Sequence, residues 1–264
     1  MWSACLRYIF TLPIMAILVW KQQGMKEIIE EIRQNLGKWL LWSTVGFGLF
    51  YAPLSMASIY GASWFVAATW QITIVAGVLL TPLFGHKIPV KNLLMSTIIL
   101  FGIVLLQINN IQQGIGNDVP IALGLIVIAA FAYPLGNRKM MSYCPAKITT
   151  IQRVFGMTLC SMPFWIVLSV IAGVRAGAPS AGQMLQSFIV ALFSGVIATV
   201  LFFEATNLVK DNPKQLAVIE ATQSGEVIFT LLGSLFFLGD TVPTIIGFLG
   251  VVVVVIGMIV NSYK

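Results

Sequence analysis

Nine long apolar stretches constrain this chain more than any other feature of its sequence. A helix rises about 1.5 Å per residue and the hydrocarbon core of a bilayer is about 30 Å thick, so about 20 apolar residues cross it. Only 9% of the residues are charged and the mean hydropathy is +0.94, which no water-soluble fold accommodates. The sequence therefore predicts an all-α membrane protein with spans at residues 2–20, 39–60, 61–84, 92–109, 119–138, 151–174, 186–209, 214–238 and 243–261.

The basic residues lie almost entirely on one side of these predicted spans. Connectors on that side, together with the C-terminus, hold 13 of the 15 lysines and arginines. Cytoplasmic loops of membrane proteins are enriched in these residues, so we expect the C-terminus in the cytoplasm and the chain in the cell (plasma or inner) membrane. The same loops account for the net charge of +6. No basic cluster is interleaved with aromatic residues, so we expect no nucleic-acid partner.

Two parts of the sequence resemble each other at an offset of about 150 residues. Ordered matches at one offset predict an internal duplication, whereas any single match between apolar helices is weak evidence. The matches pair Arg7 with the neighbourhood of Arg153, Gly46 with Gly195, Ala68-Thr69 with Ala221-Thr222, and Gly85 with Gly239.

The predicted first repeat, residues 1–110, holds four spans, and the predicted second repeat, residues 119–264, holds five. Duplication of a five-span unit inverts the topology of the second copy, which is a known transporter architecture. Extending the second copy by the same offset places a missing first helix about 35 residues before Met1. We expect the in-frame DNA upstream of Met1 to encode this helix, and a natural nine-helix variant is the alternative.

The sequence resembles the drug/metabolite transporter superfamily in its ten-helix, EamA-like form. The similar motifs are WSACLRYIF, GLFYAPLSMASIYGAS and the ending EATQSGEVIFTLLGSLFFLGD…PTIIGFLGVVVVVIG, which is close to the branch of multidrug resistance efflux transporters. Gly239-Asp240 follows the family pattern, whereas its counterpart Gly85-His86 departs from it. The resemblance implies two inverted five-helix bundles around a central cavity, which move small solutes by alternating access.

Two carboxylates, Glu220 and Glu226, lie inside the predicted span 214–238. An ionised carboxylate at the bilayer centre costs about 3 kcal/mol on insertion scales. On a helical wheel Glu220, Gln223 and Ser224 share a face that Glu226 extends. Such a face is typical of a helix that lines a water-filled cavity, where Glu220 and Glu226 would bind protons and exchange them for substrate.

Each acid also has a structural interpretation, in which a helix-end amide, a hydroxyl or Arg7 holds it in place. Arg7 lies inside the first span and is the strong cation within reach of Glu226, so an Arg7–Glu226 pair is one alternative. Glu204 lies near the cytoplasmic end of the span 186–209. Its side chain could extend to the interface instead of binding substrate or protons.

Four further residues complete the predicted substrate site. Trp70 and Gln71 lie in the middle of their span, opposite the acids in the predicted repeat, and Tyr51 and Tyr133 are aromatic residues in mid-helix. Together they could form an aromatic wall for flat, cationic compounds. Ordinary helix–helix packing is the alternative for each of them.

We therefore expect a secondary transporter that exports small hydrophobic or cationic compounds or metabolites, with protons as the candidate coupling ion. Export of amino acids or other metabolites by the same fold is one alternative, and a non-transporting membrane fragment or partner is another. No GxSG, GxGD, HExxH or Walker motif is present, so neither an enzyme nor an ATP-driven pump is expected. One histidine and three cysteines without a CxxC motif predict no metal and no cofactor. The expected partners are the lipid bilayer and a small molecule, and the sequence does not predict the oligomeric state.

Overall fold

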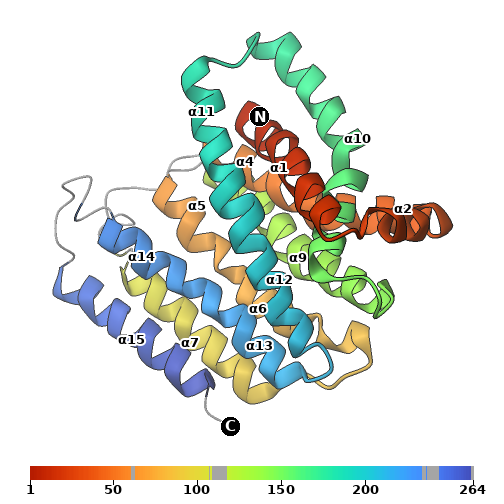
Figure 1. Ribbon diagram of the computed structural model, residues 1–264. Coiled ribbons are helices and arrows are strands. Elements are labelled where there is room, and N and C mark those ends of the chain that lie inside the picture. The colour runs from red at the N-terminus through yellow and green to blue at the C-terminus, as the bar shows by residue number, and fades with distance from the viewer. Residues whose placement is uncertain (61–62, 107, 109–117, 234–235, 237–243, 263–264) are drawn as a thin grey trace. The chain divides into compact units, whose positions relative to one another are not determined.

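The structure is a computed structural model (Figure 1) that describes residues 1–60, 63–106, 108, 118–233, 236 and 244–262. Regular structure in these ranges is helical, and none of their residues forms a β-strand. The predicted class of all-α membrane protein is confirmed. The predicted Gly239-Asp240 motif lies outside the described residues.

Nine apolar helical segments of the described chain correspond one to one with the predicted spans. Six are long and apolar enough to cross a membrane, namely Trp2–Lys21, Leu36–Tyr60, Val119–Tyr143, Thr150–Ala176, Ala181–Leu208 and Pro213–Gly233. Three are shorter, namely Val66–Leu79, Val90–Leu106 and Ile245–Asn261.

One helix occupies a stretch that the sequence analysis treated as a connector. Helix α2 spans Met25–Gln34, and its buried face contains Ile28 and Ile32, one helical turn apart. Gln152 Nε2 donates a hydrogen bond of 2.8 Å to the carbonyl oxygen of Gly24, directly before this helix. The connector prediction was wrong here. The many charged residues of this stretch lower its mean hydropathy, although its apolar residues form a stripe at helical spacing.

The chain divides into two compact units. Unit 1 comprises Met1–Ser55 and Ala132–Leu208, and unit 2 comprises Met56–Phe131 and Val209–Lys264. Each unit therefore combines segments from both predicted repeats. The repeat boundaries remain a prediction, and they differ from the boundaries of the compact units.

Unit 1 contains helices α1 and α10, which pack along each other, and the elements around them (Figure 1). Helix α10 begins at Thr150 because Thr149 and Gln152 cap each other's backbone N–H groups at 3.2 and 2.7 Å. The elements of unit 1 are α1 (Trp2–Lys21), α2, α3 (Leu36–Ser43), η1 (Thr44–Gly48), the start of α4 (Leu49–Tyr60), the end of α9 (Val119–Tyr143), α10 (Thr150–Ala176), α11 (Ala181–Val190), η3 (Ala191–Ala198) and α12 (Thr199–Leu208).

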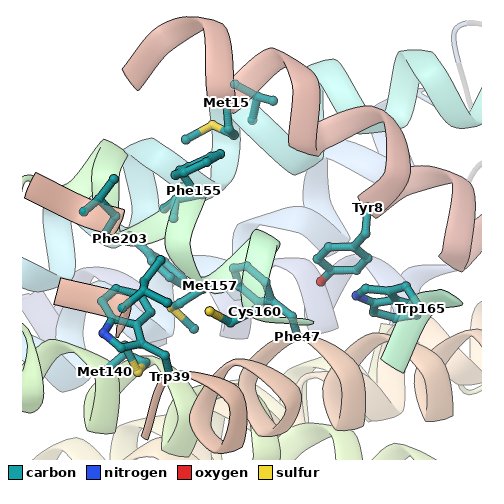
Figure 2. Packing of buried hydrophobic residues seen from close by; sticks show 14 of the residues in the cluster. Tyr8, Met15, Trp39, Phe47, Met140, Phe155, Met157, Cys160, Trp165 and Phe203 are labelled. Carbon is teal, nitrogen blue, oxygen red and sulfur yellow. The ribbon is translucent and has the colours of Figure 1, made fainter. Parts of the chain in front are cut away.

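The core of unit 1 is rich in aromatic and sulfur-containing side chains. Lipid tails are as apolar as leucine, so helices in a bilayer associate through close packing more than through exclusion of water. A Cβ atom added at Gly136 would collide with the backbone of Gly46, which shows how closely α9 approaches η1. Figure 2 shows the core side chains Tyr8, Met15, Trp39, Phe47, Met140, Phe155, Met157, Cys160, Trp165 and Phe203.

Unit 2 is organised around helices α7 and α15, which lie side by side (Figure 1). Their backbones meet at Gly102 and Gly250, and Asn92 Nδ2 donates a hydrogen bond of 2.9 Å to Asn261 Oδ1. The elements of unit 2 are the end of α4, α5 (Ser63–Trp70), α6 (Ile72–Leu79), η2 (Thr81–Phe84), α7 (Val90–Leu106), the start of α9, α13 (Pro213–Ala221), η4 (Thr222–Ser224), α14 (Gly225–Gly233) and α15 (Ile245–Ser262).

Two spans of unit 1 contain π-helical segments at matching positions of the predicted repeat. Segment η1 includes Gly46, and segment η3 includes Gly195, the residue that the sequence analysis paired with Gly46. A π-helix carries an additional residue per turn, is rare in ordinary helices and occurs frequently at functional sites. These two segments therefore point to unit 1 as one place to look for a binding site.

Two spans of unit 2, which correspond to the predicted spans 61–84 and 214–238, each contain a local change in helical hydrogen bonding. Helix α5 ends at Trp70 and α6 begins at Ile72, with Gln71 between them. Segment η4 separates α13 from α14, and within it Ser224 Oγ donates a 2.6 Å hydrogen bond to the carbonyl oxygen of Ala221. Short side-chain hydroxyls that bond to the preceding turn bend helices in this way.

Candidate functional site

Arg7 occupies a buried aromatic position in unit 1. Only 6% of this residue is exposed, and its guanidinium carbon lies 4.1 Å from the ring centroid of Tyr51 and 5.5 Å from that of Tyr8. A cation over an aromatic face gains up to about 2 kcal/mol when water is excluded. The structure thus brings together two residues of the predicted site, Arg7 and Tyr51.

A chain of aromatic contacts leads from Tyr51 to Tyr133, the third predicted site residue in this unit. The ring centroid of Phe50 lies 5.5 Å from that of Tyr51 and 4.6 Å from that of Tyr133. Tyr133 also packs on Phe202, with 5.9 Å between ring centroids. Of the four residues of the predicted aromatic wall, Tyr51 and Tyr133 therefore lie in one cluster of unit 1, whereas Trp70 and Gln71 belong to unit 2. The role of the wall in substrate binding remains a prediction.

Behind this cluster, Tyr8 stacks on Trp165 (Figure 2). Their ring centroids are 4.3 Å apart at an interplanar angle of 12°, and Trp165 is completely buried. The Trp165 indole N–H donates a 3.2 Å hydrogen bond to Ser161 Oγ, which fixes the ring. Sequence reasoning did not assign Tyr8 and Trp165 to the site. A tryptophan in mid-span, away from the interfacial belt, was the signal for Trp165.

The polar contacts of Arg7 are few. Nη2 donates a 3.1 Å hydrogen bond to Ser194 Oγ, whereas Nε has no hydrogen-bond partner among the described residues. No carboxylate in the described part of unit 1 forms an ion pair with Arg7. Ser194, another residue that sequence reasoning missed, lies on segment η3. The next residue, Gly195, lets that segment approach Thr11 of α1, where a Cβ would collide with the Thr11 hydroxyl.

Glu204, also predicted for the site, lies elsewhere in unit 1. Its side chain is exposed and lies close enough to the buried Arg153 for the two charges to interact. Arg153 also donates from Nη2 to the carbonyl oxygen of Phe203 at 3.1 Å. This arrangement supports the structural interpretation of Glu204.

In unit 2 the helix interruptions bring Gln71 and Glu226 together. Gln71 is completely buried and its neighbour Trp70 is 7% exposed. The side chains of Gln71 and Glu226 interact, although neither amide atom of Gln71 meets strict hydrogen-bond geometry with a described residue. Glu226 is exposed and lies in the first turn of α14, where the helix dipole favours a negative charge.

The second acid of unit 2, Glu220, has different surroundings. Glu220 lies in the last turn of α13 and is only 2% exposed, and Gln223 Nε2 donates a 3.1 Å hydrogen bond to its backbone carbonyl. Because η4 lies between the two acids, they do not share the continuous helical face that the wheel predicted. The two changes in helical hydrogen bonding thus lie among predicted site residues of unit 2, namely Trp70, Gln71, Glu220, Gln223 and Glu226.

The predicted Arg7–Glu226 pair joins residues of different units, so it remains a prediction. Among the described residues, no group of three or more His, Cys, Asp and Glu side chains could hold a metal ion. The groups available for chemistry in the predicted site are therefore hydrogen-bonding side chains, aromatic faces, the buried cation of Arg7 and the acids Glu220 and Glu226.

Comparisons with known proteins give the family. The family model for "EmrE: Putative multidrug resistance efflux transporter" matches residues 1–264. A Bacillus subtilis (strain 168) relative, "Uncharacterized protein YjlA", is 45% identical over 276 aligned residues that cover all of this chain and 85% of the relative. A Shouchella clausii relative, "Uncharacterized 42.1 kDa protein in intracellular alkaline protease 3'region", is 42% identical over 236 residues, or 86% of this chain and 62% of the relative.

A solved structure titled "Crystal structure of protein" has the same fold, with a TM-score of 0.73 over 98% of this chain and 86% of that chain. Its sequence identity of 13% supports the fold alone. The family, in contrast, follows from a match along the whole chain. The chain belongs to the multidrug resistance efflux transporter family of the drug/metabolite transporter superfamily, and is a multi-pass membrane protein of a transporter family.

Proposed function

We propose that this protein is a secondary transporter that exports small hydrophobic or cationic compounds by alternating access, in exchange for protons. We place it in the plasma (inner) membrane with its C-terminus in the cytoplasm, on the strength of the positive-inside pattern. In this proposal Glu226 carries the exchanged proton, and Glu220, Gln223, Gln71 and Trp70 form its surroundings.

The observation that carries the proposal is the pair of helix interruptions in unit 2. Transporters with repeated bundles bind solutes and ions where helices break in corresponding positions of the two halves. Here Gln71 and the segment Thr222–Ser224 are 3₁₀-like turns at corresponding positions of the predicted repeat, and an acid follows the second one. A short 3₁₀ stretch inside a helix often marks a functional hinge.

The chemistry of Gln71 suits a neighbour that changes its protonation state. Its amide N–H groups can donate to an ionised Glu226, and its amide oxygen can accept from the protonated acid. The side chain therefore serves both states after a small rotation. Binding a proton removes the charge of Glu226, which lowers the cost of moving this segment through an apolar surrounding.

A second candidate function is export of amino acids or other metabolites by the same fold. The observation in its favour is Arg7, because a buried cation with an unpaired Nε suits a solute that carries a negative charge.

The test of the proton role is Glu226→Gln in proteoliposomes, with ethidium efflux driven by an imposed pH gradient. Gln keeps the size and polarity of Glu but cannot titrate, so we expect pH-driven efflux to be lost while expression and insertion are unchanged. Glu204→Gln is the control, and we expect a mild effect because Glu204 lies near the end of its span, Ala181–Leu208, and its side chain is exposed. Full efflux by Glu226→Gln with an unchanged pH dependence would assign the proton to another carboxylate.

A further inference from the structure

We propose that Arg7 binds a carboxylate group of the transported solute. The inference rests on the transport function proposed above and narrows its substrate class to solutes with an acidic group on an apolar body. Zwitterions fall within this class, so it includes compounds that also carry a cationic group.

The first step is the charge balance. A guanidinium stays protonated in proteins, and buried charges are normally paired. Unit 1 surrounds Arg7 with aromatic rings and one hydroxyl, and none of its described carboxylates forms an ion pair with this residue. Nε is buried without a partner. A carboxylate can accept two parallel hydrogen bonds from the edge of a guanidinium, so it supplies both the missing charge and the missing acceptor.

The second step is accessibility. Ser194, which accepts the hydrogen bond from Nη2, is itself exposed, so the guanidinium reaches the edge of the buried region. Ser194 also lies in the middle of the apolar span Ala181–Leu208. A solute at this depth would lie near the bilayer midplane, where transporters of repeated bundles place their sites. A carboxylate that binds Nη2 of Arg7 would displace only the neutral hydroxyl of Ser194.

The third step is the contrast with Arg153, the arginine near the matching position of the predicted repeat. Arg153 is as deeply buried as Arg7, and the Nε of each lacks a hydrogen-bond partner among the described residues. The two arginines differ in the acceptor of Nη2, which is the backbone carbonyl of Phe203 for Arg153 and the exposed hydroxyl of Ser194 for Arg7. A solute can replace an exposed hydroxyl more readily than a buried backbone carbonyl.

The surroundings define the rest of the solute. The Tyr51 ring covers one face of the guanidinium, so a planar carboxylate would approach along the N–H edge, from the side where Nη2 reaches the exposed Ser194. Tyr51 connects through Phe50 to Tyr133, so an apolar body attached to that carboxylate would find aromatic side chains beside it. Arg7 would then bind the charged group of the solute, and the aromatic side chains next to Arg7 would contact its apolar body.

The test uses the full chain in lipid nanodiscs, with benzoate as the probe and benzamide as its neutral counterpart. We expect benzoate to raise Tm and to give a saturable change in tryptophan fluorescence, and we expect no such effects from benzamide. Arg7→Gln should raise the apparent Kd for benzoate by more than about ten-fold. Arg7→Lys should retain part of the response, since it keeps the charge but loses the bidentate edge. The matched control is Arg175→Gln, which removes an exposed arginine and should leave the response unchanged.

Three outcomes would overturn the proposal. An equal response to benzoate and benzamide would show that the charge is not recognised. An unchanged benzoate response in Arg7→Gln would place the site elsewhere. A benzoate response that appears only after Glu226→Gln would show that a carboxylate of the chain already satisfies Arg7. None of these depends on proton exchange, so failure of the Glu226 proposal in the efflux assay leaves benzoate binding as a separate result.

Discussion

Arg7 and Arg153, two of the three buried arginines of unit 1, differ in the groups that surround them. Arg153 has Glu204 nearby and donates to the carbonyl oxygen of Phe203, in addition to lying 5.3 Å from the Phe203 ring centroid. Arg7 has the Tyr51 ring at 4.1 Å and the Ser194 hydroxyl, and no described carboxylate of its unit pairs with it. The same residue type at matching places of the predicted repeat therefore donates to a buried backbone carbonyl in one case and to an exposed hydroxyl in the other, while the Nε of each lacks a partner among the described residues.

This difference separates a structural cation from a functional one. A buried charge that the protein satisfies contributes to the fold, and its removal leaves a buried acceptor without a donor. A buried charge that the protein leaves unsatisfied costs stability until a ligand arrives, and such a cost is retained where function needs it. We therefore expect the free energy of unfolding to change differently when Arg153 and when Arg7 is replaced by Gln.

The largest expected effect is on the stability of Arg153→Gln compared with Arg7→Gln. Removing Arg153 breaks its hydrogen bond to the buried carbonyl of Phe203, and charge-assisted hydrogen bonds are worth about 2–3 kcal/mol. Removing Arg7 breaks a hydrogen bond to an exposed hydroxyl and a contact with the Tyr51 ring, and it also removes the cost of burying a charge, so its loss of unfolding free energy should be smaller. Thermal unfolding of both variants in nanodiscs measures this. A comparable loss of Tm in Arg7→Gln would show that Arg7 is structural as well.

Much of the fold follows from the sequence, because the length of an apolar run decides whether it crosses a bilayer. The nine predicted spans correspond to the nine apolar helices of the described chain. Helix α2 and the breaks at Gln71 and η4 were not predicted. Hydropathy averages over a window, so it does not detect a short amphipathic helix or a change from α-helical to 3₁₀ hydrogen bonding within an apolar run.

The structure shows how the residues of the predicted site are grouped, which the sequence did not predict, while their role in binding remains a prediction. Arg7, Tyr51 and Tyr133 do share one cluster, while Gln71 and Glu226 meet in the other unit. Sequence order gives the depth of a residue in the membrane, but the direction of a side chain around its helix depends on every break and π-helical turn before it. For this reason Ser194, which lies on a π-helix, could not be assigned to Arg7 from a regular helical wheel.

A smaller effect is expected from Gly195→Ala, which tests how segment η3 reaches Arg7. A Cβ at this position would collide with the Thr11 hydroxyl of α1, so η3 and with it Ser194 must move away from Arg7. We expect a loss of about 1–2 kcal/mol from overpacking and a weaker benzoate response. Gly182→Ala, in the preceding helix α11 and with open space at its Cβ, is the matched control and should change neither quantity. If both variants behave alike, the close approach of η3 to α1 does not position Ser194.

The smallest effect concerns the reactivity of the Cys144 thiol, which reports how accessible the surroundings of Arg153 are to water. Modifying this thiol should leave the stability of the protein unchanged. This thiol follows α9, outside the membrane-spanning helices, and lies near Arg153 and the buried Glu31. Burial raises the pKa of Cys144 to about 12, with Glu31 adding to the rise and Arg153 opposing it. Only the thiolate attacks maleimides, so a higher pKa leaves less of the reactive form at a given pH.

At pH 7.5 we therefore expect N-ethylmaleimide to modify Cys144 more than about ten-fold more slowly than a cysteine introduced by Lys147→Cys, an exposed position in the same loop. The Cys144 rate should rise steadily as the pH increases through 9 and 10, because its thiolate fraction is still far from saturation there. Peptide mass spectrometry separates the two sites and removes any contribution from the buried Cys5 and Cys160. Equal rates at pH 7.5 would mean that water reaches this end of unit 1 freely, and Arg153 would then be as open to a solute's carboxylate as Arg7 is.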